Sequence, residues 1–143
     1  MTSLVLELKQ GESMILNGAV IRFKTRTRLE LNNHARFLFG KQIMRAEDAS
    51  SPIRQAYFAL QEAYISKEEA RAAALQAARE LVATMLATAD EEARRGWAAL
   101  LRLCTEDTAL EALKLARQMI QAEEAQTAAR SASSLASRPG TSG

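Results

Sequence analysis

Apolar and polar side chains alternate along the beginning of the chain. Residues 4–9 read Leu-Val-Leu-Glu-Leu-Lys, which places the three leucines on one side of an extended backbone. Asn17-Gly18, flanked by apolar residues, is typical of a two-residue hairpin turn. Further alternating or apolar segments follow, the last being Phe37-Leu38-Phe39. The pattern predicts four or five short antiparallel strands within residues 1–45, and their apolar face must be covered by the rest of the chain.

The spacing of apolar residues changes to a helical period after residue 50. Ser51 is placed to cap a helix and Pro52 to occupy its first turn, where a missing N–H costs nothing. The apolar face of this helix then follows at i, i+4, i+7 and i+11: Ile53, Tyr57, Leu60 and Tyr64. The sequence therefore predicts a first helix that starts at residue 52.

Three more helix starts are indicated by polar residues. Ser66 and Glu69 have the spacing of a capping box before an alanine-rich segment. Asp90 begins an acidic run that suits the positive end of a third helix, and Thr105 is positioned to cap a fourth. The pattern predicts about four helices within residues 51–130.

The fold class expected from these patterns is α+β, with a small N-terminal antiparallel β unit followed by a C-terminal helical bundle of about four helices. Residues 1–45 form the β-rich subdomain and residues 51–130 the α-helical subdomain. Residues 131–143 are rich in serine, glycine and alanine and offer little apolar surface to offset the ordering entropy. We expect this tail to be disordered.

Composition limits the class of protein. A chain of 143 residues fits one domain, or a small domain fused to a helical one, and an aromatic content of 5% predicts a thin core. The single cysteine, Cys104, cannot form an internal disulfide, and no apolar run approaches the roughly 18 residues of a transmembrane helix. No export signal is visible, so we expect a cytoplasmic protein that does not span a membrane.

Positive charge is concentrated in the N-terminal part. Residues 1–45 carry eight Lys/Arg against three Glu, whereas the remainder carries eleven Lys/Arg against fourteen Asp/Glu. A basic surface can hold a polyanion through its phosphates. The candidate RNA-binding residues are therefore the eight basic side chains of the β-rich part: Lys9, Arg22, Lys24, Arg26, Arg28, Arg36, Lys41 and Arg45.

Two interpretations of this region remain open. In one, the basic residues contact phosphates while Phe23, Phe37 and Phe39 stack on unpaired bases. In the other, Arg22, Lys24, Arg26 and Arg28 are solvent-facing hairpin residues without a ligand, and the phenylalanines are core residues. For the phenylalanines a core role is favoured, because the sheet has few other large apolar residues.

Catalytic and cofactor signatures are absent from the sequence. His34 is the only histidine and has no cysteine or acidic cluster at metal-ligand spacing, so neither a metal site nor a histidine-based triad is expected. Cys104 lies on a predicted apolar helix face, which favours a core residue over a nucleophile. The glycines are too widely spaced for a phosphate-binding loop. We expect no enzyme activity and no cofactor.

Four sequence blocks resemble the FlbT family of bacterial flagellar regulators. The first is residues 4–12 followed by residues 15–20, with the run Asn-Gly-Ala-Val as its clearest part. It is followed by Leu38 with residues 41–44, by Pro52 with residues 57–61 and 63–64, and by residues 112–117 with Ile120, all in the family's order. The chain departs from the family pattern at Phe39, where arginine is usual, and at Gln42, where aspartate is usual.

The resemblance implies a post-transcriptional regulator that acts on the 5′ leader of flagellin mRNA, changing translation or decay, commonly beside a FlaF-like partner protein. The direction of regulation differs among relatives. The alternative function is a protein-binding adaptor that acts through FlaF or flagellin without touching RNA, using its amphipathic helices. A thin, alanine-rich core also suggests self-association into a homo-oligomer.

Overall fold

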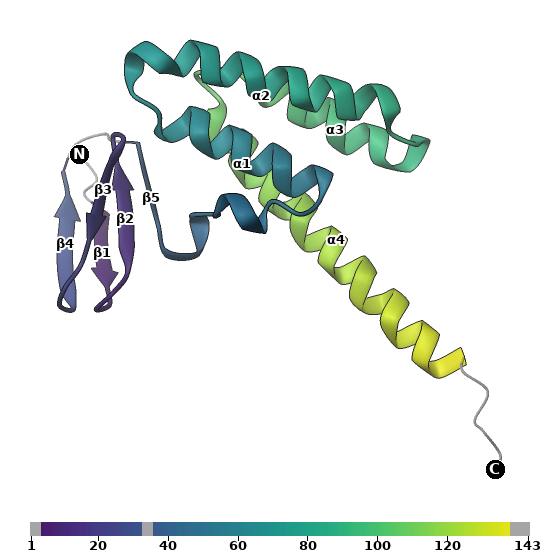
Figure 1. The fold of residues 1–143 in the computed structure, drawn as a ribbon, viewed down its shortest axis with the longest axis horizontal. Helices are drawn as coiled ribbons and strands as arrows, with labels where there is room; N and C mark the ends of the chain where they lie inside the picture. The colour runs from purple at the N-terminus through teal and green to yellow at the C-terminus, as the bar shows by residue number, and fades with distance from the viewer. Residues whose placement is uncertain (1–3, 33–35, 138–143) are drawn as a thin grey trace.

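The computed structural model describes residues 4–32 and 36–137, apart from the side chains of Lys41 and residues 134–137. It contains an N-terminal unit of short antiparallel strands followed by four helices (Figure 1). The α+β prediction is confirmed. No described helix is long and apolar enough to cross a membrane.

The strands form two small antiparallel sheets. The first pairs β1 (Leu4–Leu8) with β4 (Thr27–Leu31), and the second has the order β3 (Ala19–Arg22), β2 (Ser13–Leu16), β5 (Phe37–Phe39). The tight turn joining β2 to β3 is the predicted one, since Asn17 and Gly18 both have positive φ, 48° and 86°, and Leu16 pairs with Ala19. The predicted hairpin turn is confirmed.

The segments on either side of residues 24–26 do not form the expected hairpin. Strands β3 and β4 belong to different sheets, because β4 pairs with β1 and sets Leu29 opposite Leu6. This register lets apolar side chains of β1 and β4 face one core, in which Leu6, Leu8 and Met14 are buried. The burial of these side chains therefore determines that β4 pairs with β1, although β3 is closer to β4 along the chain.

The helices are α1 (Pro52–Ile65), α2 (Glu68–Thr88), α3 (Glu91–Leu103) and α4 (Ala109–Ser137). Ser51 caps α1 as predicted, with its hydroxyl accepting from the Arg54 N–H, and the Asp90 carboxylate accepts from the Ala93 N–H at the start of α3. A second core, separate from the sheet core, joins the helices through Leu60, Trp97 and Leu113.

Two of the predicted caps are wrong or displaced. Ser66 makes no capping box, because its hydroxyl donates to the Ala63 carbonyl at the end of α1, and α2 begins after Lys67 without a side-chain cap. Thr105 accepts from the Thr108 N–H in the turn before α4, which begins only at Ala109. A hydroxyl side chain can donate to a backbone carbonyl or accept from a backbone N–H. Sequence spacing alone therefore does not reveal which backbone group Ser66 or Thr105 binds.

Helix α4 is longer than predicted. Residues 131–137, expected in a disordered tail, continue the helix to Ser137, while residues 138–143 lie outside the described part. Alanine has the highest helix propensity, and a helix that has already formed extends at little cost per residue. The C-terminal half of α4 projects beyond the other helices (Figure 1).

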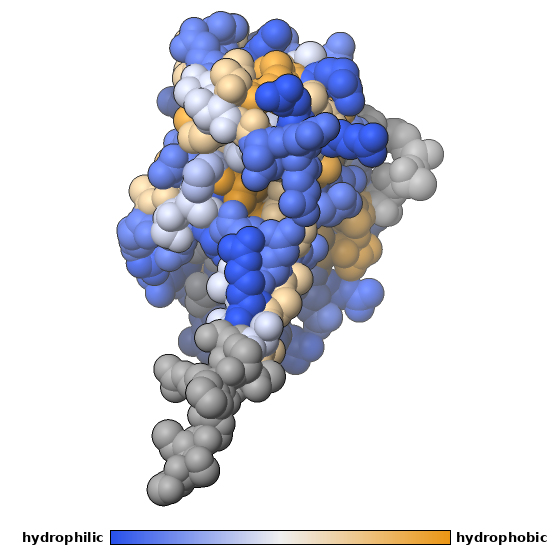
Figure 2. Space-filling model, turned by 90° about the vertical axis from the view of Figure 1, so that its right-hand side faces the viewer, coloured by the Kyte–Doolittle hydropathy of each residue, from blue (hydrophilic) through white to orange (hydrophobic). Residues whose placement is uncertain are grey.

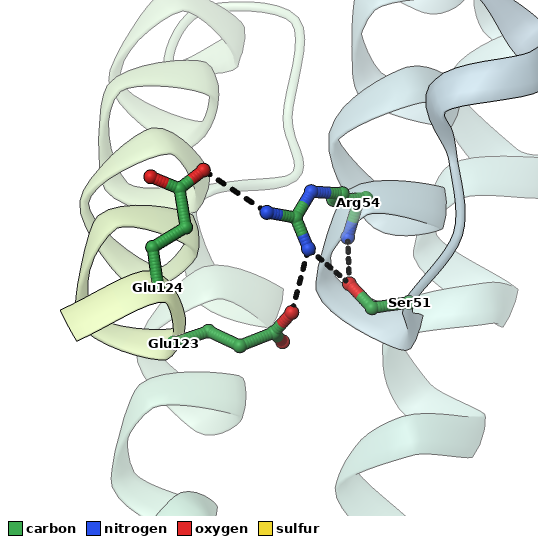
Figure 3. A network of polar contacts seen from close by, with 4 residues as sticks. All are labelled: Ser51, Arg54, Glu123 and Glu124. Atoms are coloured by element: carbon green, nitrogen blue, oxygen red, sulfur yellow. Dashed lines mark hydrogen bonds and ion pairs between the residues drawn. The ribbon is translucent and has the colours of Figure 1, made fainter. Parts of the chain in front are cut away.

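An arginine on α1 anchors the middle of α4. The Arg54 guanidinium binds the Glu123 carboxylate at 2.8 Å and the Glu124 carboxylate at 3.0 Å, while also reaching the capping hydroxyl of Ser51 at 3.4 Å (Figure 3). Its side chain is only 23% exposed, so these charge-assisted contacts are partly shielded from water. The network fixes the point from which the end of α4 projects.

Candidate functional site

Two connections meet at the end of the β unit that lies away from the helices (Figure 1). The turn between β1 and β2 is bonded to the connection between β3 and β4, because the Gly11 N–H donates to the Phe23 carbonyl at 2.7 Å and the Phe23 N–H donates to the Glu12 carbonyl at 3.0 Å. Gly11 has φ +88°, a conformation that favours glycine. These bonds bring residues that are distant in sequence to one end of the β unit.

Five of the eight predicted RNA-binding residues lie at or beside these connections, and we call them the basic end: Lys9, Arg22, Lys24, Arg26 and Arg28. A shallow pocket of about 350 Å³ opens between the two connections. It is lined by Gln10, Gly11, Arg22, Phe23 and Lys24. A phosphate or a base bound in this pocket would contact the cationic side chains of Arg22 and Lys24 and the ring of Phe23.

Carboxylates compensate part of this charge. Arg26 binds Glu7 at 2.7 Å, and Arg28 stands opposite Glu7 in the strand register. Arg26 lowers the pKa of Glu7 through this hydrogen bond and its charge. Because side chains of both residues are more than half exposed, the pair can open at little cost to meet a phosphate. Among the described residues no ion-pair partner is found for Lys9, Arg22 or Lys24.

The side chains of Glu12 and Asn17 hold segments of the β unit together, and neither side-chain contact was predicted from the sequence. The Glu12 carboxylate accepts the Lys9 backbone N–H at 2.7 Å, closing the turn that carries the basic end. The Asn17 side chain accepts the Arg36 N–H at 3.0 Å at the opposite end. Each polar residue adjoins a glycine, which is the local signal that could have identified both.

Two of the other three predicted residues make contacts outside the basic end, and the third has no described side chain. Arg45 forms an exposed ion pair with Glu47, and Lys41 lies in the short 3₁₀ turn Gly40–Gln42, with its side chain outside the described part. Arg36 lies at the junction between the β unit and the helices. Arg36 and Arg45 are therefore engaged outside the basic end, whereas Lys41 directly follows Gly40, whose backbone adjoins the Glu12 carboxylate of the β1–β2 turn.

Arg36 connects three segments of the fold. Its guanidinium donates to the Tyr64 carbonyl at 3.5 Å and to the Glu106 carbonyl at 3.3 Å, and it lies 5.2 Å from the centre of the Tyr64 ring. Burial raises the pKa of the Tyr64 hydroxyl, while the charge of Arg36 acts in the opposite direction. These contacts give Arg36 a structural role at the ends of α1 and of the α3 to α4 connection.

The three phenylalanines pack against the sheet core. Phe23, Phe37 and Phe39 are half-buried around Leu8 and Met14, and the rings of Phe37 and Phe39 stack at 6.2 Å between centroids. Phe23 also borders the pocket of the basic end. The phenylalanines thus serve as core residues in this structure, and only Phe23 adjoins the basic pocket.

The two departures from the family pattern also have structural contacts. The Gln42 side chain accepts the Phe39 N–H at 3.2 Å, and the Gln42 carbonyl accepts the Tyr57 hydroxyl at 2.6 Å. Phe39 contributes apolar surface to the sheet core. Residues 39 and 42 therefore fasten the end of the β unit to α1.

Cys104 lies in the helical core and is fully buried, with its thiol donating to the Leu100 carbonyl at 3.2 Å. Burial raises the pKa of this thiol to about 11, so the nucleophilic thiolate is scarce at neutral pH. His34 lies outside the described residues. Within residues 4–32 and 36–137, no group of three His, Cys, Asp or Glu side chains is arranged to hold a metal ion.

Comparison with known proteins identifies the family. Residues 4–127 match the family described as Flagellar protein FlbT. The probable flagellum biosynthesis repressor protein FlbT of Mesorhizobium japonicum is 33% identical over 121 residues, which cover 85% of this chain and 82% of that protein. The protein of the same name from Brucella ovis is 43% identical over 60 residues, 42% of this chain and 40% of that protein. No solved structure matches significantly. The chain belongs to the FlbT family.

Proposed function

We propose that this protein regulates flagellin expression after transcription by binding the 5′ leader of flagellin mRNA through the basic end. Regulation of flagellum biosynthesis is supported by the relatives, which are named as probable repressors of that process. The RNA part of the proposal is supported by one observation, the grouping of cationic side chains around an open pocket at one end of the β unit.

The chemistry of the basic end suits a single strand of RNA. Arg22 and Lys24 border the pocket from one connection, and Lys9 stands on the neighbouring turn, so successive phosphates of a strand could be contacted from two sides. Proteins read unpaired RNA mainly in loops and single strands, where phosphates and bases are both accessible. Side-chain charges at the basic end face solvent, so they require no refolding to meet a ligand.

The charge distribution of the whole chain would orient the RNA. The helical part carries more acidic than basic residues, whereas the β-rich part carries an excess of basic ones. A polyanion is therefore attracted to the β unit and repelled from the helices. This long-range field favours one docking orientation but gives no sequence preference.

A salt series tests the proposal. The full chain is titrated against the labelled flagellin leader and against a scrambled RNA of equal length, at several salt concentrations. Direct phosphate contacts predict an affinity that falls steeply with salt, and recognition of the leader predicts a constant preference over the scrambled RNA.

The adaptor function gives a different result. A protein that acts through a FlaF-like partner or through flagellin would bind that protein while showing no measurable affinity for the leader at low salt. That pair of results would reject the RNA proposal and select the adaptor.

A further inference from the structure

An open groove lies where α3 and α4 meet the start of α1. Its volume is about 420 Å³, and its apolar floor includes Ile53, Trp97 and Met119. Glu92 and Glu123 place two carboxylates on its rim. Figure 2 views the molecule from the right-hand side of Figure 1 and shows apolar surface lying between hydrophilic residues. The groove thus combines an apolar floor with a negative rim.

The end of α4 extends from this groove without covering it. Among the described side chains of α4 the last buried one is Ile120, and residues 124–133 are all exposed. The segment from residue 121 to the end of α4 would measure about 25 Å as a helix. The segment is helical as the continuation of α4, and burial of its exposed side chains against a partner surface would stabilise it further.

One face of this segment continues the groove in a regular pattern. Met119, Ala122, Gln126, Ala129 and Ser133 follow one another at alternating spacings of three and four residues. The side chains after Met119 are small or uncharged, which permits two helix backbones to approach closely. Glu123 and Arg130 flank this face on the same side, one helical repeat apart.

We propose that the groove is occupied by the end of α4 from a second copy of this chain. The two α4 helices pack antiparallel around a two-fold axis, so that Gln126 lies opposite the partner's Ala129 and each free end covers the other's groove. Each copy then buries the same surface, its groove and the end of its α4. Because both copies use this surface, no site is left for a third copy and the assembly ends at a dimer.

Charge complementarity selects this occupant and its direction. In the antiparallel register Arg130 of each copy meets the negative rim formed by Glu92 and Glu123 of the other. Glu123 already binds Arg54, but its side chain is 36% exposed and can accept a second donor. In a parallel arrangement Arg130 of one copy and Glu123 of the other would lie at different levels along the helices and could not form this ion pair.

The test is the mass of the full chain in solution, measured by sedimentation equilibrium over a concentration series. Wild-type protein is expected to change from monomer to dimer as concentration rises. Arg130→Glu should weaken dimerisation about tenfold or more, because the dimer contains the altered contact twice and attraction becomes repulsion. Gln126→Leu should strengthen it by adding apolar surface at the centre of the contact.

Two further variants separate groove occupancy from other contacts. Ala93→Trp places a large side chain at the groove from α3 and should weaken dimerisation without altering α4. Ala128→Glu changes an exposed residue on the outward face of α4 and should leave the dissociation constant unchanged. Circular dichroism verifies that each variant is folded.

A monomeric mass for wild type and for Gln126→Leu at every concentration would overturn the proposal. So would folded Arg130→Glu and Ala93→Trp variants that dimerise as tightly as wild type. The proposal does not depend on RNA binding, and none of these measurements includes RNA.

Discussion

The side chain of Gln61 pairs with the backbone of Met44 in both directions. Its carbonyl oxygen accepts the Met44 N–H at 2.7 Å and its amide nitrogen donates to the Met44 carbonyl at 2.9 Å. Gln61 is 2% exposed and is the one buried polar side chain found among the described residues. The amide thus acts like a neighbouring strand for a segment that has none, and it fastens the link between the β unit and the helices to α1.

Replacing Gln61 with leucine should lower the free energy of unfolding by about 2 to 4 kcal/mol, because two backbone groups of Met44 lose their partners inside the protein. Urea unfolding followed by circular dichroism measures the change. Gln61→Glu supplies an informative comparison, since only the protonated carboxyl can donate to the Met44 carbonyl. Its stability relative to wild type should improve as the pH is lowered from 8 to 5, and a Gln61→Leu variant as stable as wild type would contradict the assigned role.

Arg36 should behave as a structural residue in mutagenesis. Both Arg36→Ala and Arg36→Lys are expected to lose about 1 to 3 kcal/mol of stability, because neither side chain can reach the Tyr64 and Glu106 carbonyls from one planar group. The salt dependence of leader binding should remain that of wild type in Arg36→Ala, which removes the charge. A folded Arg36→Ala variant with a weaker salt dependence would instead return Arg36 to the RNA interface.

Cys104 should make stability depend on alkaline pH. Burial raises the thiol pKa from about 9.0 to about 11, so the folded protein keeps its proton at pH values where the unfolded chain releases it. The contribution is complete below pH 9 and is lost as pH rises through 11, amounting to about 2 to 3 kcal/mol. Between pH 8 and 11 the free energy of unfolding, measured in urea, should fall less for Cys104→Ala than for wild type. Equal falls in the two proteins would contradict the contribution of the Cys104 thiol.

Removing residues 131–143 should leave the thermal midpoint of the monomer nearly unchanged. The described side chains of this segment, residues 131–133, are exposed and contribute little burial. The comparison requires a protein concentration at which the full chain is monomeric, because self-association would add stability through mass action. A loss of several degrees at that concentration would show that the segment packs against its own chain.

Local signals in the sequence predicted the elements that depend on local chemistry. Asn17-Gly18 formed the predicted turn because both residues tolerate positive φ, and Ser51-Pro52 began α1 because a cap and a missing N–H act within one turn. The pairing of β1 with β4 was missed, since it joins segments about twenty residues apart and depends on which leucines share a core. The polar composition of residues 131–137 does not reveal the length of α4, because exposed segments rich in alanine can be helical without burying apolar surface.

The candidate site was predictable in composition but not in geometry. Basic residues were identified by charge, yet only the bonds of Gly11 and Glu12 to Phe23 explain why Lys9 joins Arg22 and Lys24. Arg36 carries the same charge but is engaged by backbone carbonyls that the sequence does not reveal. Side-chain charge indicates attraction to RNA, whereas the tertiary contacts determine which charges remain available.

The basic end provides the most direct test of the proposed function. Changing Arg22, Lys24, Arg26 and Arg28 together to alanine should weaken binding of the flagellin leader and reduce its salt dependence. Each lost phosphate contact on a single strand lowers the slope of log affinity against log salt by about 0.7. If all four contact phosphate, the slope should therefore fall by nearly 3, measured by anisotropy over a salt series.

A matched control removes the same charge from the helical part. Changing Arg94, Arg95, Arg102 and Lys114 to alanine alters four exposed residues and produces the same net charge. Both variants should stay folded, because exposed charges usually affect stability by less than about 0.5 kcal/mol each. If the RNA meets the basic end, only the first variant loses affinity and slope. Equal losses of RNA affinity in both variants would show that binding depends only on net charge. An unchanged affinity of the first variant would remove the basic end from the mechanism.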